Sequence, residues 1–107
     1  MIKNYFKGII KCQHCNKNYI RKTDHGTAVF ICSTANNYGK QTCPQSRRIK
    51  EEEIVKLINR HCEIYNKDYT IEKTKLFVRK IEVAENILTI FYKDGTKTLI
   101  SPNQIIF

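Results

Sequence analysis

The 107-residue sequence predicts an α+β fold, in which a small β-ribbon is followed by two short helices and a closing antiparallel β-hairpin. Three observations support this fold class. Four of the five cysteines fall within the first 43 residues, between segments with strand-like composition. An apolar stripe with helical periodicity begins after residue 50, and an Asp-Gly turn separates two apolar segments near the C-terminus.

The β-ribbon is expected to be held together by a metal ion. Cys12 and Cys15 form a C-x2-C pair, and Cys32 and Cys43 form a wider C-x10-C pair. Residues 18–31 read as strand, turn and strand, so a hairpin returns the chain to the first pair. Tetrahedral Zn²⁺ needs four thiolate or imidazole ligands, and this spacing supplies four thiolates. The sequence therefore predicts one structural zinc ion.

A strand is expected to lead into the first cysteine pair. Residues 4–11 are short, β-branched and aromatic, which is typical of a strand. Gly8 interrupts this segment and predicts a bulge or a point of close approach.

Two other uses of the cysteines remain open. A disulfide framework is less favoured, because five cysteines is an odd number and no apolar signal segment opens the chain. A redox C-x-x-C pair normally lies where a strand meets a helix, and no helix signal follows this pair. His14 and His25 could each replace a thiolate, but four cysteines already complete a closed site. Both histidines are therefore expected at the surface, His25 in the hairpin turn.

The first helix is expected to begin near Lys50. Three glutamates, at residues 51–53, place negative charge in its first turn, where the helix dipole favours it. Ile49 and Ile54 occupy the two positions of a hydrophobic staple. Cys62 is expected to be a small buried thiol, and His61 a core histidine with satisfied hydrogen bonds. The predicted apolar stripe consists of Ile54, Leu57, Ile58, His61 and Tyr65.

The remaining residues predict a shorter helix and closing strands. Thr70 can cap a helix over residues 71–80. Three β-like segments follow at 80–83, 86–92 and 96–101, and the last two flank Asp94 and Gly95. Residues 102–107 form a candidate extra strand. We divide the chain into a ribbon, 1–48, and a helical and closing part, 49–107, within one compact domain.

Positive charge is concentrated in the ribbon half of the sequence. Residues 1–50 contain ten Lys and Arg against one acid, Asp24, whereas residues 51–107 contain nine of each sign. Four thiolates and one zinc would lower the formal charge of +9 to about +7. Such a local excess is typical of nucleic-acid binding, because cations placed on phosphates release condensed counterions. Membrane binding is disfavoured, since no apolar run could span a bilayer and no amphipathic helix carries the excess.

Specific residues around the cysteines resemble a known family. Residues 6–11, Phe-Lys-Gly-Ile-Ile-Lys, lead into Cys12, and Phe30-Ile31 leads into Cys32. Ile49 opens a glutamate-rich helix, and Lys80-Ile81-Glu82-Val83 comes later, followed by residues 87–92. This order is similar to the zinc-ribbon region of large serine recombinases, the integrases and transposases of phages and conjugative elements. The resemblance covers nearly the whole chain.

The resemblance implies a non-catalytic, DNA-recognising part of a site-specific recombinase. In that family the catalytic serine lies in a preceding domain, so no serine here is expected to be a nucleophile. The implied partners are duplex attachment-site DNA and other recombinase subunits, in the cytoplasm, with no membrane and no small-molecule substrate. Many members carry a long coiled coil inserted in this domain. The roughly thirty residues between Lys50 and Lys80 fit only two short helices.

DNA contacts are expected at the hairpin, in the loop between Cys32 and Cys43, and just after it. Arginine and asparagine can read base edges, whereas lysines mainly hold phosphates. An alternative function is a zinc-stabilised protein-interaction module that contacts recombinase subunits through the neutral half. An enzymatic role is disfavoured, because four thiolates leave no open coordination position. The predicted contact residues are Arg21, Lys22, Asn36, Asn37, Tyr38, Lys40, Arg47 and Arg48.

Overall fold

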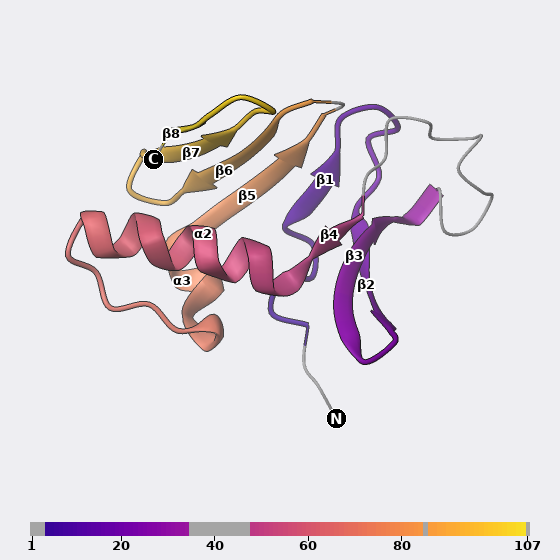
Figure 1. Cartoon of the computed structure of the whole chain (residues 1–107), viewed down its shortest axis with the longest axis horizontal. Helices are drawn as coiled ribbons and strands as arrows, with labels where there is room; N and C mark the ends of the chain where they lie inside the picture. The colour runs from indigo at the N-terminus through magenta and orange to yellow at the C-terminus, as the bar shows by residue number, and fades with distance from the viewer. Residues whose placement is uncertain (1–3, 35–47, 85, 107) are drawn as a thin grey trace.

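Two β-sheets and the helix α2 (Glu51–Ile64) form the framework of the protein (Figure 1). The structure is a computed structural model, and it describes residues 4–34, 48–84 and 86–106. The α+β class predicted from the sequence is confirmed. The smaller sheet has the order β2 (Tyr19–Asp24), β3 (Thr27–Cys32) and β4 (Ile49–Lys50). The larger sheet has the order β1 (Ile10–Cys12), β5 (Val78–Val83), β6 (Leu88–Tyr92), β7 (Lys97–Ile100) and β8 (Ile105–Ile106).

The predicted hairpin is present as β2 and β3. The two strands pair antiparallel from Tyr19 opposite Cys32 to Asp24 opposite Thr27. His25 and Gly26 form the connecting turn with φ values of 52° and 80°. Positive φ at both central residues defines the tight turn whose twist matches that of antiparallel strands. His25 is exposed in this turn, as predicted.

The segment before the first cysteine is a turn rather than the predicted strand. Only β1 is extended, and the backbone N–H of Ile9 donates to the carbonyl of Phe6 (3.0 Å). Gly8 has φ of 77°, which a type II turn requires at its third position. The turn places the Phe6 ring in the core, where it meets Phe30 edge to face with 5.3 Å between ring centroids. The strand prediction was therefore wrong for residues 4–9, because the glycine sets a turn.

Helix α2 follows the sequence prediction at its start and departs from it at its end. Ile49 and Ile54 are both buried, as expected for the staple. The buried positions on α2 are Ile54, Ile58, His61 and Cys62. Tyr65 is 43% exposed, although it was predicted to be part of the apolar stripe. The helix ends at Ile64, so Tyr65 no longer continues the helical repeat, and Asn66 adopts a positive φ of 57°.

The second helix is shorter than predicted. It consists of the 3-10 turn η2 (Ile71–Lys73) and one α-helical turn, α3 (Thr74–Phe77). Thr70 occupies the N-cap position without a side-chain capping bond. Strand β5 then begins at Val78 instead of Lys80, because Val78 and Ile81 are β-branched and bury their side chains in the core. The hairpin of β6 and β7 has its turn at residues 93–96, as predicted, and β8 supplies the candidate extra strand.

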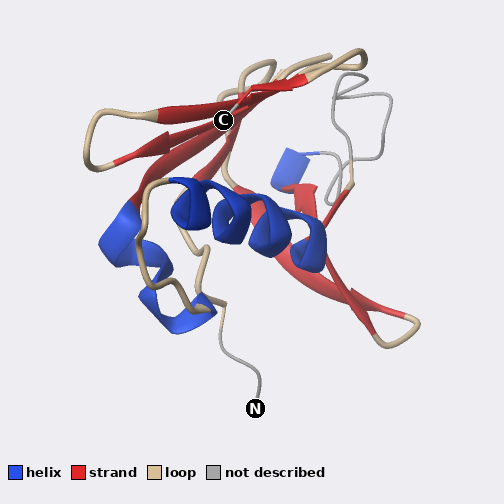
Figure 2. Ribbon diagram, turned by 60° about the vertical axis from the view of Figure 1, so that its left-hand side comes forward, coloured by secondary structure: helices blue, strands red, loops and turns tan. Residues whose placement is uncertain are grey.

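A parallel pairing of β1 with β5 joins the N-terminal and C-terminal halves of the chain. Ile10 lies opposite Ile81, and Cys12 lies opposite Val83. Strand β4 in turn joins the ribbon sheet by pairing with β3. The sheets therefore run across the predicted boundary at residue 48. Figures 1 and 2 show α2 and α3 on the same side of the five-stranded sheet, so the core lies between α2, this sheet and the ribbon.

A buried polar group lies in this core. The His61 ring stacks on Tyr92 with 3.8 Å between centroids and an interplanar angle of 4°. Its Nε2 and Nδ1 lie 3.0 Å and 3.3 Å from the hydroxyl oxygens of Thr96 and Thr98. The Tyr92 hydroxyl also bonds to Thr98 (2.8 Å). His61 is thus a core histidine with both ring nitrogens bonded, as the sequence suggested.

The buried His61 predicts a loss of stability at mildly acidic pH. Burial lowers its pKa below the ordinary value of 6.5, only partly opposed by the Asp94 carboxylate. The unfolded chain therefore takes up this proton at a higher pH than the folded chain. The contribution of His61 to the free energy of unfolding is fully present above pH 6.5. It decreases as the pH falls from 6.5 towards the lower pKa of the folded chain, by at most about 1.4 kcal/mol per pH unit for one proton.

Chemical unfolding of the zinc-loaded chain between pH 7.5 and 5.5 checks this prediction. We expect His61→Gln to lower the stability at neutral pH and to flatten its dependence on pH. Thiolate protonation also weakens zinc binding in acid, but it affects both proteins equally. Parallel pH profiles for the variant and the wild type would contradict the assignment.

Candidate metal centre

The first two cysteines lie in a tight loop between β1 and β2. The backbone N–H of Cys12 donates to the carbonyl of Lys17 (2.9 Å), and the N–H of Asn16 donates back to the carbonyl of Cys12 (2.9 Å). Asn16 has φ of 62°, a left-handed conformation that asparagine tolerates better than most residues. These bonds fold the C-x2-C segment back on itself and bring the Cys12 and Cys15 sulfurs together.

The hairpin brings a third cysteine to the same place. Cys32 ends β3 opposite Tyr19, and the N–H of Ser33 donates to the carbonyl of Asn18 (3.2 Å). The Sγ atoms of Cys12, Cys15 and Cys32 all lie within 4.8 Å of one another, and those of Cys15 and Cys32 are 3.2 Å apart. A tetrahedral zinc ion with Zn–S bonds of about 2.3 Å separates its sulfur ligands by about 3.8 Å. The three thiols therefore fit one zinc ion with small adjustments.

The cysteines that the structure describes differ in role. No disulfide joins the four cysteines within the described residues, Cys12, Cys15, Cys32 and Cys62. Cys62 lies on α2, outside the three-sulfur cluster, and burial raises its pKa, as expected of a packed thiol. Cys43 lies outside the described residues, so its role as the fourth ligand stays a prediction.

Local hydrogen bonds favour the thiolate form at Cys15. Partial burial would raise its pKa, but hydrogen bonds to Thr34 and to Cys32 lower it. The backbone N–H of Lys17 also donates to this sulfur, and the net result is a pKa of about 6. Because the thiolate is the form that binds a metal, the loop is prepared for zinc near neutral pH.

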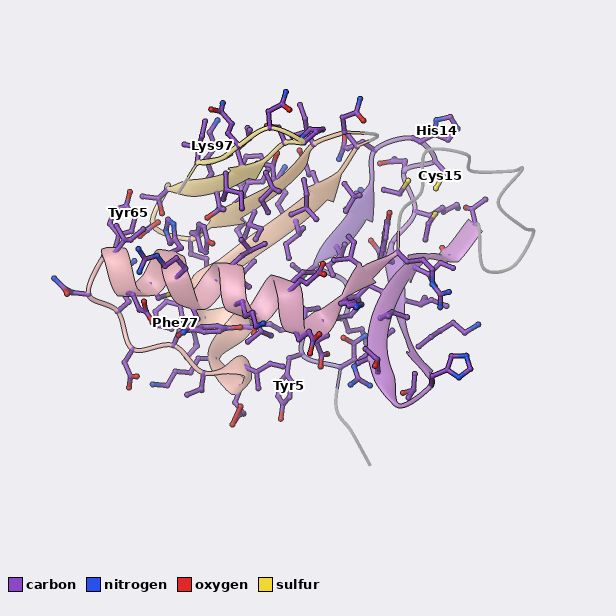
Figure 3. All side chains as sticks on the ribbon, in the orientation of Figure 1. Tyr5, His14, Cys15, Tyr65, Phe77 and Lys97 are labelled. Carbon is purple, nitrogen blue, oxygen red and sulfur yellow. The ribbon has the colours of Figure 1, made fainter. Side chains whose placement is uncertain are left out.

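Neither nearby histidine contributes to the cluster. His14 is exposed, and Figure 3 shows its ring pointing outward from the loop that carries Cys15. His25 is exposed in the hairpin turn between β2 and β3, at the opposite end of these strands from Cys32. Both placements agree with the expectation that the histidines lie at the surface.

The metal centre is also connected to the C-terminal half, a link that was not predicted from the sequence. The N–H of Gln13, inside the C-x2-C pair, donates to the carbonyl of Val83 at the end of β5 (2.9 Å). This bond continues the pairing of β1 with β5 into the cysteine loop. The position of two ligands is thus coupled directly to the five-stranded sheet.

The predicted DNA-contact residues are found in different environments. Arg21 lies in the middle of β2, opposite Phe30, and not near the hairpin tip. Its guanidinium donates to the Glu51 carboxylate at 2.8 Å and 3.4 Å, and the two side chains are only 12% and 16% exposed. Lys22 and Arg48 are exposed. The other five predicted contacts, Asn36, Asn37, Tyr38, Lys40 and Arg47, lie outside the described residues.

Three cysteines gathered at the base of a β-hairpin define a zinc β-ribbon protein. The comparison with known families is more specific, because residues 5–63 match the model of the recombinase zinc beta ribbon domain. This match covers more than half of the sequence, and the chain therefore belongs to that family. Searches of curated proteins and of solved structures gave no match.

The family match and the cysteine cluster together establish the type of domain and its metal site. The chain is a zinc ribbon domain of the recombinase type, a non-catalytic accessory domain, with a site for one structural zinc ion. None of the helices within the described residues is long and apolar enough to cross a membrane.

Proposed function

We propose that the chain recognises duplex attachment-site DNA as a zinc-ribbon domain of a site-specific serine recombinase acting in the cytoplasm. The observation that carries this proposal is the charge distribution. All of the formal charge of +9 comes from the first fifty residues, and residues 5–63 are those that match the recombinase family. If the positive charge served only solubility and were spread evenly, one half would not have a net charge of +9 and the other a net charge of zero.

The described part of the ribbon presents cations that phosphates can reach. Lys7, Lys17, Lys22 and Arg48 are all exposed. A groove of about 500 Å³ beside β2 is lined by hydrogen-bonding groups and cations from the N-terminal turn and from β2. Its polar members are Asn4, Lys7, Asn18, Tyr19 and Arg21. Amide and ammonium groups are among the donors that bind the DNA backbone.

Arg21 has a positioning role in this proposal. Its ion pair with Glu51 links β2 to the first turn of α2, so the guanidinium holds the ribbon against the helix. The other seven predicted residues divide by chemistry. Asn36, Asn37, Arg47 and Arg48 are candidates for base edges, Lys22 and Lys40 for phosphates, and Tyr38 for a further contact from the loop. Bound zinc would cross-link the ends of β1 and β3 and so hold the hairpin in one orientation.

Double substitution of Arg47 and Arg48 with alanine tests the proposed surface. We expect affinity for a duplex attachment half-site to fall about 10- to 100-fold, and the slope of log K against log salt to decrease by about 2. The matched control is Lys56→Ala with Arg60→Ala, which removes two exposed cations from α2. Equal affinity and equal salt slope for the two double variants would contradict a ribbon-centred DNA surface.

A further inference from the structure

The five-stranded sheet has a second face that no described helix covers. Helices α2 and α3 lie on one side, which receives the buried side chains of β1, β5, β6 and β7. The side chains between these buried positions point to the other side, because strand residues alternate. Strand pairing places them in two cross-strand rows, which we call the outer face. The rows are Lys11, Glu82, Thr89, Leu99 and Ile106, and Lys80, Phe91 and Lys97.

The composition of the outer face differs from that of a solvated sheet. Antiparallel sheets with one wet face usually alternate apolar and polar residues. Here Phe91, Leu99 and Ile106 occupy outward positions on three adjacent strands. Ile106 is 50% exposed, and Phe91 and Leu99 are partly exposed. An apolar centre of this kind, rimmed by charge, is typical of a protein interaction surface.

The charges around this apolar centre are predominantly positive. Lys11 and Lys97 are exposed on outward positions, and Lys80 lies 3.1 Å from Glu82, the only acid in the two rows. The other described acids of the second half lie on α2, on η2 or in the segments that join the helices and strands. The outer face therefore carries an uncompensated positive charge, although residues 51–107 as a whole are neutral.

We infer that the outer face docks an acidic amphipathic segment of a protein partner. The apolar side of that segment would cover Phe91, Leu99 and Ile106, and its carboxylates would pair with Lys11 and Lys97. Five strands about 4.8 Å apart span roughly 19 Å, which accommodates one α-helix about 10 Å wide. None of these residues is among the predicted DNA contacts, although Lys11 is one of the ten cations of residues 1–50.

The same residues argue against nucleic acid as the occupant. Proteins bind single strands by stacking bases on exposed aromatic rings. The Lys80 ammonium lies over the Phe91 ring, 4.9 Å from its centroid, where a base would have to stack. A duplex presents phosphates and gains little from contact with Leu99 and Ile106. Protein contact uses both the apolar centre and the cationic rim.

A synthetic amphipathic helix with leucine on one face and glutamate on the other is a suitable probe. We expect it to bind the zinc-loaded chain and to shift the NMR signals of Phe91, Leu99 and Ile106. A scrambled peptide of the same composition should bind at least tenfold more weakly. Lys11→Glu with Lys97→Glu should weaken binding of the designed peptide at least tenfold, whereas the control Lys56→Glu on α2 should not.

Four outcomes would overturn the inference. Equal binding of both peptides, or signal shifts confined to the ribbon, would remove the outer face as a docking site. Shifts of the outer-face signals by duplex DNA, together with weaker DNA binding by the Lys11 and Lys97 variant, would make it a nucleic-acid surface. Concentration-dependent self-association that is abolished by Phe91→Ser would make a second copy the occupant. Both lysine changes lie outside the predicted DNA contacts. If the variant loses peptide binding but binds DNA as the wild type does, docking on the outer face and DNA binding by the ribbon are tested independently.

Discussion

Removal of zinc is expected to unfold the chain. The described ligands lie at the ends of β1 and β3, and the backbone bonds described around Cys15 are two short-range bonds made by Cys12 and Asn16 and the single bond from Gln13 to Val83. Structural zinc sites contribute apparent free energies of about 10–16 kcal/mol, whereas a domain of this size is stable by only about 5–15 kcal/mol. Addition of a strong chelator should therefore collapse the NMR signal dispersion, and stoichiometric zinc should restore it.

Single cysteine substitutions distinguish ligands from the packed thiol. We expect Cys32→Ser to abolish zinc binding and to leave the chain largely unfolded at 25 °C, and Cys43→Ser to do the same if Cys43 is the fourth ligand. The control is Cys62→Ala, which also removes a buried thiol but should retain one zinc per chain. A folded Cys32→Ser variant with one tightly bound zinc would contradict the proposed centre.

Truncation of Phe30 is expected to have the second-largest effect. This side chain is 1% exposed, contacts the Phe6 ring and lies in β3 opposite Ile49. It therefore joins the N-terminal turn, the hairpin and β4, the strand that leads into α2. Loss of a fully buried aromatic side chain costs about 3–5 kcal/mol, so Phe30→Ala should lower the free energy of unfolding by that amount.

Denaturant unfolding of the zinc-saturated protein measures this change. Ile106→Ala is the matched control, because it also shortens an apolar strand residue but at a half-exposed site. We expect the control to change the stability by no more than about 0.5 kcal/mol. Similar losses for the two variants would show that the Phe30 cluster is not a central part of the core.

The elements that the sequence predicted correctly depend on short-range signals. The hairpin is indicated by two strand-like segments around Gly26, and the start of α2 by Ile49, three glutamates and Ile54. The cysteine spacing likewise predicted that Cys12, Cys15 and Cys32 would meet, since one hairpin is enough to bring them together. Each of these predictions involves residues that are close in sequence.

The features that sequence reasoning missed depend on distant partners. Nothing near Ile10 indicates that it will pair with Ile81 in a parallel ladder. Arg21 was predicted to be a DNA-contacting cation because its ion-pair partner, Glu51, lies thirty positions later in the sequence. The outer face could not be recognised either, because Phe91 and Leu99 are ordinary strand residues until the strand order is known.

The parallel pairing of β1 with β5 also has a consequence for the order of folding. The partner of Ile10 lies about seventy residues further along the chain, so during synthesis β1 cannot form this pairing until β5 emerges from the ribosome. Closing so long a loop is slow, because its entropic cost precedes any stabilising contact. The cysteine loop and hairpin need only the first part of the chain. We therefore expect metal capture to precede completion of the large sheet, with the bond between Gln13 and Val83 among the last native contacts to form.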